Sequence, residues 1–246
     1  MSVAGRGSER STIRRTEAVT FDALGTLVAL EPPGPLLREG LRAKAGIEIS
    51  FAQADAALAA EISYYRAHLD EGRDRESLAG LRRRCTETLR EALPANAQAI
   101  EIDLLEAILL DALQFSAFDD AREAIEAIRR LPARVLVVSN WDVSLEDVLL
   151  RLGLEPLLDG VITSASAGAR KPSEAIFARA LGLAGVAPER AVHVGDSVEE
   201  DVGGARRAGI EPILLSRDGH TGPPGVRTIS GLGELPAELR HLVQPL

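Results

Sequence analysis

Residues 18–30 read AVTFDALGTLVAL, and this stretch decides which fold the sequence predicts. A short apolar run stops at Asp22, and Gly25 and Thr26 follow within four residues. An apolar run of this length with turn-forming residues behind it predicts a buried strand that ends at a carboxylate. Gly25 permits a tight bend after the strand, and we expect the Thr26 hydroxyl to make a hydrogen bond that holds this bend.

Beyond residue 118 the sequence alternates between short apolar strands and amphipathic helices. Strands are predicted at 134–138, 160–163, 191–194 and 212–215, and helices at 120–130, 145–152, 173–183 and 198–208. Together with the strand before Asp22, this alternation predicts an α/β fold. Its core would be a doubly wound, Rossmann-like parallel sheet of five strands with right-handed crossovers.

The segment between the first strand and this alternating part has no convincing strand pattern. Three prolines at 31–35 predict a break in regular structure. Helical periodicity then predicts helices at 51–69, 75–93 and 97–113. The sequence Ser50-Phe-Ala-Gln53 has the form of a capping box, which supports the start of the first of these helices.

The predicted domain organisation follows from the position of this helical block. We expect a core formed by residues 17–32 and 116–246, an all-helical cap of residues 33–115 inserted after the first strand, and a flexible tail of residues 1–16. Because the insert leaves the sheet where its first strand ends, the cap should lie over the carboxyl edge of the sheet. In open α/β sheets this edge is where ligands bind.

Composition excludes several function classes. A net charge of −9 and an aromatic content of 3% argue against a nucleic-acid-binding or anionic-membrane-binding role. Cys85 is the single cysteine, so an intrachain disulfide and a cysteine zinc site are excluded. No apolar run approaches the roughly 20 residues of a membrane span, and the first residues carry no secretory signal pattern. We therefore expect a cytoplasmic protein whose partner is a small molecule.

Polar residues follow the predicted strands at one common edge of the sheet. They are Asp22 with Thr26, Ser139 with Asn140, Lys171 before Pro172, and Asp196 with Asp201. Each pair taken alone is typical of ordinary turn and cap chemistry. Their occurrence in one chain at one sheet edge predicts a ligand site.

These residues belong to four short motifs, FDALGTL at 21–27, VVSN at 137–140, the lysine before Pro172, and GDSVEED at 195–201. With them the sequence resembles the haloacid dehalogenase-like hydrolases, which carry the four motifs in this order. The resemblance covers residues 18 to about 215, including the position and helical nature of the cap. It implies a hydrolase that works through a covalent intermediate on its first motif aspartate, Asp22.

The resemblance also implies roles for the other motif residues. Ser139 and the Asn140 backbone N–H would bind the transferred group, and Lys171 would balance negative charge between nucleophile and substrate. Mg²⁺ would be held by Asp22, the backbone carbonyl of Leu24 and Asp196.

Two further residues near these motifs have more than one expected role. Asp201 would bind the metal, hold a metal-bound water or orient Lys171. Trp141, directly after Asn140, would either contact substrate or pack between cap and core. His193 is expected to be a core or sheet-face residue rather than a ligand.

Leu24 departs from the family pattern and keeps three functions open. Phosphatases of the family carry a second aspartate there, which acts as general acid. The first function is Mg²⁺-dependent hydrolysis of a small phosphorylated metabolite, which would be slow here because Leu24 cannot donate a proton. Aryl and acyl phosphates would be affected least. Dehalogenases of the family also lack that aspartate, because a halide leaves without a proton, which makes a metal-independent 2-haloacid dehalogenase the first alternative. A non-catalytic or regulatory ligand-binding protein is the second.

Two features oppose the dehalogenase alternative. Asp196 occupies a motif position where the dehalogenases carry Ser or Asn. Those enzymes also bind the substrate carboxylate with a cap arginine about thirty residues after the nucleophile, and the segment 50–53 contains none. Arg38 and Arg42 are the nearest arginines, and we expect both to be solvated helix residues.

Overall fold

The computed structural model describes residues 16–241, so the tail expected over residues 1–16 lies, except for residue 16, outside the described part. Its central feature is a parallel sheet in the strand order β5-β4-β1-β6-β7-β8. The strands are β1 (Ala18–Phe21), β4 (Arg134–Ser139), β5 (Gly160–Thr163), β6 (Ala191–Gly195), β7 (Glu211–Leu215) and β8 (Arg227–Ile229). The predicted α/β, Rossmann-like sheet is confirmed, with all five expected strands and a sixth, β8, that the sequence analysis missed.

Strand β1 occupies the middle of the sheet and is buried on both faces. It pairs with β4 and β6, so that Phe21 lies opposite Val137 on one side and Val194 on the other. Val19 and Phe21 belong to one buried cluster, whereas Ala18 belongs to another. This alternation is the two-residue period of a strand covered on both faces.

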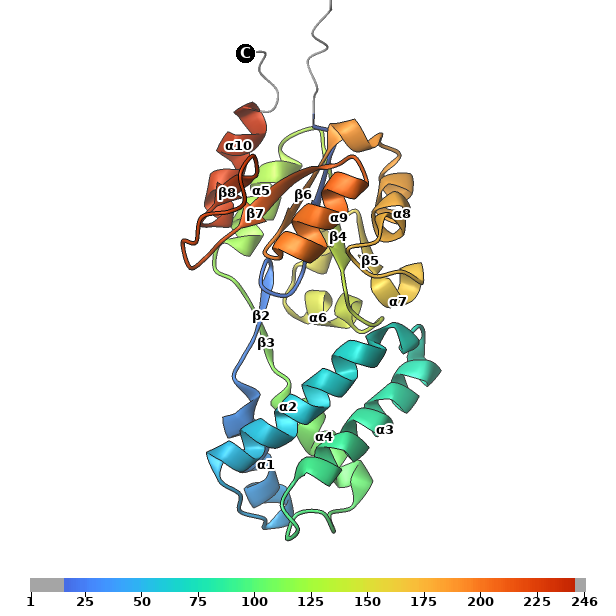
Figure 1. The fold of residues 1–246 in the computed structure, drawn as a ribbon, viewed down its shortest axis with the longest axis vertical. Helices are drawn as coiled ribbons and strands as arrows, with labels where there is room; N and C mark the ends of the chain where they lie inside the picture. Colours follow the sequence, from blue (N-terminus) through green and yellow to red (C-terminus); the bar gives the residue numbers. More distant parts are fainter. Residues whose placement is uncertain (1–15, 242–246) are drawn as a thin grey trace, which may run out of the picture.

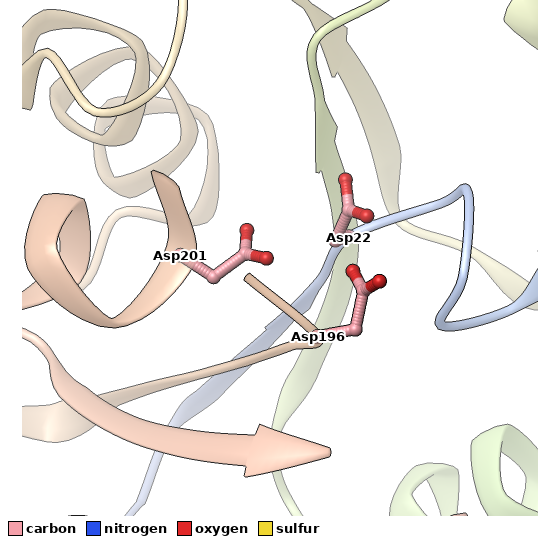
Figure 2. A group of neighbouring side chains, drawn as sticks. All are labelled: Asp22, Asp196 and Asp201. Carbon is pink, nitrogen blue, oxygen red and sulfur yellow. The ribbon is translucent and has the colours of Figure 1, made fainter. Parts of the chain in front are cut away.

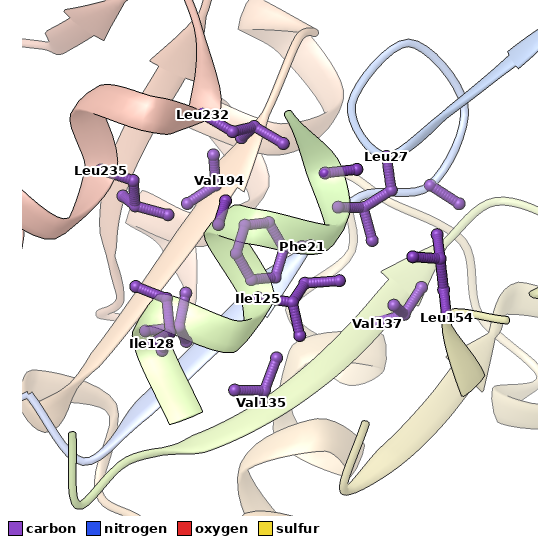
Figure 3. Close-up of a cluster of buried hydrophobic side chains, with 14 of the residues drawn as sticks. Phe21, Leu27, Ile125, Ile128, Val135, Val137, Leu154, Val194, Leu232 and Leu235 are labelled. Carbon is purple, nitrogen blue, oxygen red and sulfur yellow. The ribbon is translucent and has the colours of Figure 1, made fainter. Parts of the chain in front are cut away.

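Helices supply the two covering layers. On the Phe21 face lie α5 (Ala121–Arg129), α6 (Leu145–Arg151) and α10 (Leu235–His241), and Figure 3 shows Phe21 packed among Ile125 and Leu235 from α5 and α10. On the Ala18 face lie α8 (Glu174–Ala184) and α9 (Gly203–Arg207), preceded by the short helix α7 (Ser164–Ala167). The sheet is therefore doubly wound.

A separate four-helix unit is inserted between β1 and β4. It consists of α1 (Pro33–Ala45), α2 (Phe51–His68), α3 (Arg75–Ala92) and α4 (Ile102–Ala112), which enclose an apolar cluster of their own. Figure 1 shows this unit below the sheet, joined to it by β2 (Val28–Leu30) and β3 (Phe115–Ala117), which pair in antiparallel fashion. We call residues 33–112 the helical insert.

Three local expectations for this part of the chain were wrong. Helix α1 begins at Pro33, inside the proline-rich stretch where a break was expected. A helix tolerates proline in its first turn, because the N–H at that position has no helical partner. Helix α4 begins at Ile102, since turns occupy much of residues 94–100. Strand β3 was missed because three residues are too short for a periodic pattern.

Other elements match their predictions closely. Ser50 and Gln53 form the expected capping box at the start of α2, in which the Ser50 hydroxyl accepts from the Gln53 N–H and the Gln53 side chain accepts from the Ser50 N–H. Among residues 16–241, no helix has the length and apolar character needed to cross a membrane.

Candidate functional site

Asp22 follows the last residue of β1, at the edge of the sheet that faces the helical insert. Its N–H donates to the Val194 carbonyl at 2.9 Å, which extends the pairing of β1 with β6 by one residue. Its carboxylate oxygen Oδ1 accepts from Ser139 Oγ at 2.9 Å and lies 2.5 Å from Lys171 Nζ. The residue is only 6% exposed, and both of these donors contact the same carboxylate oxygen.

The bend after Asp22 requires glycine for two reasons. Gly25 has a φ of 84°, a left-handed conformation that other residues adopt only with strain. A Cβ on Gly25 would lie 2.3 Å from Asp196 Oδ2, far inside contact distance. The bend thereby allows the Asp196 carboxylate to lie directly against the loop.

Thr26 does not hold this bend in the expected way. Its Oγ1 is buried without a hydrogen-bond partner in the described part of the chain. Backbone hydrogen bonds close the bend instead, from Thr26 N–H to the Ala23 carbonyl at 3.2 Å and from Gly25 N–H to the Val28 carbonyl at 2.8 Å. A short loop closed by its own backbone needs no side-chain bond.

Asn140 lies beside the backbone of Lys171. Its Oδ1 accepts from the Lys171 N–H at 2.7 Å, and its Nδ2 donates to the Lys171 carbonyl at 3.0 Å. This pair of bonds joins the loop after β4 to the loop before α8. The side chain of Asn140 is thus a positioning group for Lys171, a role that the sequence analysis, which considered its backbone N–H, did not include.

Lys171 connects Asp22 with Asp201. Its Nζ lies 2.5 Å from Asp22 Oδ1 and 2.6 Å from Asp201 Oδ1, and the lysine is only 1% exposed. Of the three roles expected for Asp201, the structure shows the contact that orients Lys171. Asp201 Oδ2 also accepts from the Ser197 N–H at 2.9 Å, which anchors Asp201 to the loop after β6.

His193 extends this chain of contacts into the sheet. Its Nε2 lies 2.9 Å from Asp201 Oδ1, and its Nδ1 lies 2.8 Å from Thr20 Oγ1. An ionised carboxylate only accepts hydrogen bonds, so Nε2 carries the hydrogen in the contact with Asp201. The expectation of a buried sheet residue is correct, but its contact with Asp201 was missed, because a single histidine in a strand has no spacing pattern to reveal it.

Burial and mutual charge shift the pKa values of these groups in opposite directions. Burial alone would raise the pKa of Asp201, but the charge of Lys171 and the His193 hydrogen bond outweigh it and lower the pKa well below its usual value. Burial would also lower the pKa of Lys171, yet the two carboxylates raise it. Burial raises the pKa of Asp22, with Lys171 opposing the shift and Asp201 reinforcing it. This arrangement keeps Lys171 and Asp201 ionised.

Asp196 completes a cluster of three carboxylates with Asp22 and Asp201, shown in Figure 2. One carboxylate oxygen from each lies within 4.8 Å of the others. Asp196 as a whole residue is exposed to solvent. Partial desolvation of its carboxyl, together with the charges of Asp22 and Asp201, raises its pKa to about 7.

The cluster fits a divalent cation. When ionised, the three carboxylates and Lys171 carry two net negative charges, which one Mg²⁺ would neutralise. Oxygen ligands from one or two carboxylates are the usual protein contribution to a Mg²⁺ site.

A pocket of about 390 Å³ opens next to this cluster, between the sheet edge and the helical insert. Leu24, Asn140 and Trp141 line it from the core. Helices α2, α3 and α4 line it from the insert, and Phe115 of β3 contributes the junction. Leu24 is 38% exposed, while Trp141 is buried against the Phe115 ring at a centroid distance of 5.1 Å. Trp141 therefore both packs between core and insert and lines the pocket.

Polar contacts tie the insert to the core around this pocket. Tyr65 of α2 donates to Asp142 Oδ2 at 2.8 Å. Arg170, next to Lys171, donates to Asp70 Oδ2 at 2.7 Å and to the Arg66 carbonyl at 3.0 Å. The loop that carries Lys171 and the loop after Asn140 are thus both attached to the insert.

Arg38 and Arg42 do not line this pocket. Arg38 donates to the Ile49 carbonyl and lies over the Phe51 ring, and Arg42 pairs with Glu39 on the surface. Arg66, Arg82 and Arg151 line the pocket instead.

Comparisons with known proteins agree on the class of protein. The sequence pattern of the haloacid dehalogenase-like hydrolases matches residues 16–209. Haloacid dehalogenase-like hydrolase domain-containing protein 3 of Xenopus laevis is 44% identical over 95 residues, which cover 39% of this chain and 39% of that protein. The chain thus matches less than half the length of this curated relative.

Two solved structures resemble the fold over most of its length. A HAD phosphatase from Thermococcus onnurineus superimposes with a TM-score of 0.63 at 25% identity, covering 91% of this chain and 98% of that one. A 2-haloacid dehalogenase from Pseudomonas syringae pv. Tomato DC3000 superimposes with a TM-score of 0.67 at 24% identity, covering 92% and 99%. The second likeness concerns the fold alone. Because the family pattern spans strands β1 to β6, the insert and all four motifs, the chain belongs to the haloacid dehalogenase-like hydrolases.

Proposed function

We propose that this protein hydrolyses a small phosphorylated metabolite through an aspartyl-phosphate on Asp22, with Mg²⁺ held by Asp22, Asp196 and the backbone carbonyl of Leu24. The observation that carries the proposal is the cluster of Asp22, Asp196 and Asp201 around Lys171. A phosphoryl group brings negative charge, and bound Mg²⁺ would supply the positive charge that stabilises it. The likeness to a HAD phosphatase supports the same reaction class.

In the first step the Asp22 carboxylate attacks phosphorus. Lys171 and Ser139 both contact Oδ1, which leaves Oδ2 for the attack. The new O–P bond forms as the bond from phosphorus to the ester oxygen breaks, and that oxygen leaves with the electron pair. The Asn140 N–H donates to a phosphoryl oxygen, as does the Ser139 hydroxyl once it turns from Asp22 toward the substrate, and Lys171 stabilises the charge that collects between nucleophile and phosphoryl group.

In the second step a water molecule attacks phosphorus and releases inorganic phosphate. The O–P bond to Asp22 breaks, and its electron pair returns to the carboxylate. Splitting one displacement into two is the advantage of a covalent intermediate. The contacts of Lys171 with Asp22 and Asp201 hold the nucleophile in the same position for both steps.

Leu24 limits which phosphate esters react well. It lines the pocket two residues after Asp22 and has no proton to donate to the leaving oxygen. A general acid contributes roughly 10²- to 10⁴-fold, so alkyl phosphates should react slowly. Aryl and acyl phosphates, whose leaving groups need little protonation, should react faster.

The direct test is hydrolysis of 4-nitrophenyl phosphate with Mg²⁺ and with a chelator in its place. We expect turnover that requires Mg²⁺ and is lost in Asp22→Asn. Asp119→Asn, a change at an exposed aspartate, is the matched control and should retain full activity. Turnover without metal, or turnover that survives Asp22→Asn, would contradict the proposal.

Leu24 also favours a second function, metal-independent hydrolysis of a 2-haloacid. A halide leaves carbon without a proton, so a side chain with no acid function next to the nucleophile would be no handicap. Attack of Asp22 on the carbon would form an ester and release the halide. Halide release from 2-chloropropionate in the presence of chelator would establish this function, and its absence would reject it.

A further inference from the structure

We propose that the pocket binds a largely apolar organic group carrying one hydrogen-bond donor, and that Glu61 of α2 accepts this hydrogen bond. The inference rests on the proposed function, because the pocket would hold the part of the substrate that leaves with the ester oxygen. It assigns the class of that leaving group, which the reaction at Asp22 does not specify.

The pocket walls are mainly hydrocarbon. From the insert, leucines of α3 and α4 line the pocket together with Ile62 of α2, and Leu30 and Phe115 line it where the insert joins the core. Leu24 and Trp141 line it from the core. A volume of about 390 Å³ is within the usual range for small-molecule sites.

Glu61 is a buried carboxyl among the residues that line the pocket. It is only 4% exposed and lines the pocket from the second half of α2. Within residues 16–241, Glu61 forms no salt bridge with a lysine or arginine, and the Cys85 thiol, a weak donor, is the side chain that lowers its pKa. Arg66 and Arg82 also line the pocket, but neither forms a salt bridge with Glu61.

The Glu61 carboxyl has neither a positively charged partner nor a strong hydrogen-bond donor. Burial raises the pKa of Glu61 to about 7, and the Cys85 hydrogen bond offsets only part of this shift. A ligand donor would supply the hydrogen bond that the protein does not provide. An ammonium would add charge complementarity, and a hydroxyl would supply the hydrogen bond alone.

Trp141 provides a direct signal for binding. It is the single tryptophan of the chain and lines the same pocket. We would titrate the protein with 3-phenylpropylamine, 3-phenylpropan-1-ol and propylbenzene and follow Trp141 fluorescence without phosphate or Mg²⁺. These probes share one apolar skeleton and differ in the donor. The amine and the alcohol are expected to bind about tenfold more tightly than propylbenzene, the usual effect of one hydrogen bond to a charged or buried acceptor.

Two variants assign this preference to Glu61. In Glu61→Leu all three probes should bind with similar affinity. In Glu61→Gln, which keeps the acceptor oxygen but not the charge, the alcohol should retain its advantage and the amine should lose it. Glu91→Gln, a change at an exposed glutamate of α3, should behave as wild type.

Equal affinity of the three probes for wild type would overturn the proposal. So would an unchanged donor preference in Glu61→Leu, or the absence of any binding. If Glu61→Leu does not fold, the amine result in Glu61→Gln decides the question. These measurements do not depend on turnover, so a failure of the aspartyl-phosphate reaction would leave them unaffected.

Discussion

Lys171 balances the negative charges of the two buried carboxylates at the site. It is buried between two carboxylates, so its removal would leave Asp22 and Asp201 facing each other without a counter-charge. The same ammonium stands where the negative charge of a phosphoryl group would gather. Both the stability of the folded protein and the proposed reaction would therefore depend on the Lys171 side chain.

Lys171→Met should accordingly lower the free energy of unfolding by about 3 to 5 kcal/mol, the usual result of breaking a buried ion pair. Urea denaturation measures it. Lys44→Met is the control, because Lys44 pairs with Asp111 on the surface and its loss should cost about 1 kcal/mol or less. Equal stability of the two variants would show that the buried pairs contribute little.

Leu24→Asp should create the general acid that the site lacks. The side chain is partly exposed and lines the pocket, so a carboxyl there can face the leaving oxygen. We expect hydrolysis of an alkyl phosphate to rise by about 10²-fold, with a smaller rise for an aryl phosphate. Steady-state rates on the two substrates measure this, and a rise of the same size on both would argue against proton donation.

Glu61 should make stability fall as the pH rises. Its pKa is about 7 in the folded protein against 4.5 for the free side chain, so folding favours the protonated form. The stabilising proton is present below pH 4.5 and is lost as the pH passes through 7. Relative to Glu61→Gln, wild type should lose about 2 to 3 kcal/mol between pH 5 and pH 8. Denaturation at both pH values tests this, and parallel pH profiles would contradict it.

The bend after β1 allows the Asp196 carboxylate to lie against the loop that follows Asp22. Gly25→Ala should strain a left-handed residue and push the Asp196 carboxylate away. We expect a cost of about 1 to 2 kcal/mol in stability and a loss of Mg²⁺-dependent turnover. Gly46→Ala, at a φ of 67° with open space around it, shares the strain without the collision. It should keep its activity, and equal loss in both variants would exclude a role for the close approach.

Elements with a strong local pattern were predictable from the sequence. Strands β1, β4, β5, β6 and β7 are apolar runs bounded by turn residues, and the capping box at Ser50 marks the start of α2. The errors concern elements whose pairing is decided at long range. Strands β3 and β8 have three residues each and depend on distant partners. The helical start at Pro33 was missed because prolines both break helices and begin them.

At the level of the whole molecule, the motif residues could be predicted to share one edge, but their contacts could not. Parallel strands bring Asp22, Ser139 and Asp196 together by topology alone. The contact of His193 with Asp201 and the bonds of Asn140 to the Lys171 backbone depend on side-chain directions that no spacing encodes. The pocket likewise arises only when α2, α3 and α4 pack over the loop that carries Trp141.

In this structure the insert and the core line one pocket and are joined by hydrogen bonds beside it. Tyr65 contacts the loop after Asn140, and Arg170 links the Lys171 loop to Asp70. The groups that would hold phosphate therefore lie next to the groups that would select its organic part. This proximity is the structural basis for treating Asp22 and Glu61 as two ends of one binding site.

Transfer of a phosphoryl group to Asp22 is the central step of the proposed reaction. Mixing the protein with an aryl phosphate and Mg²⁺, quenching in acid within the first turnover and analysing the peptides by mass spectrometry tests this directly. We predict one added phosphoryl group on the peptide that contains Asp22, and none in Asp22→Asn. Turnover with no phosphorylated peptide, or with the phosphoryl group on another residue, would contradict the account.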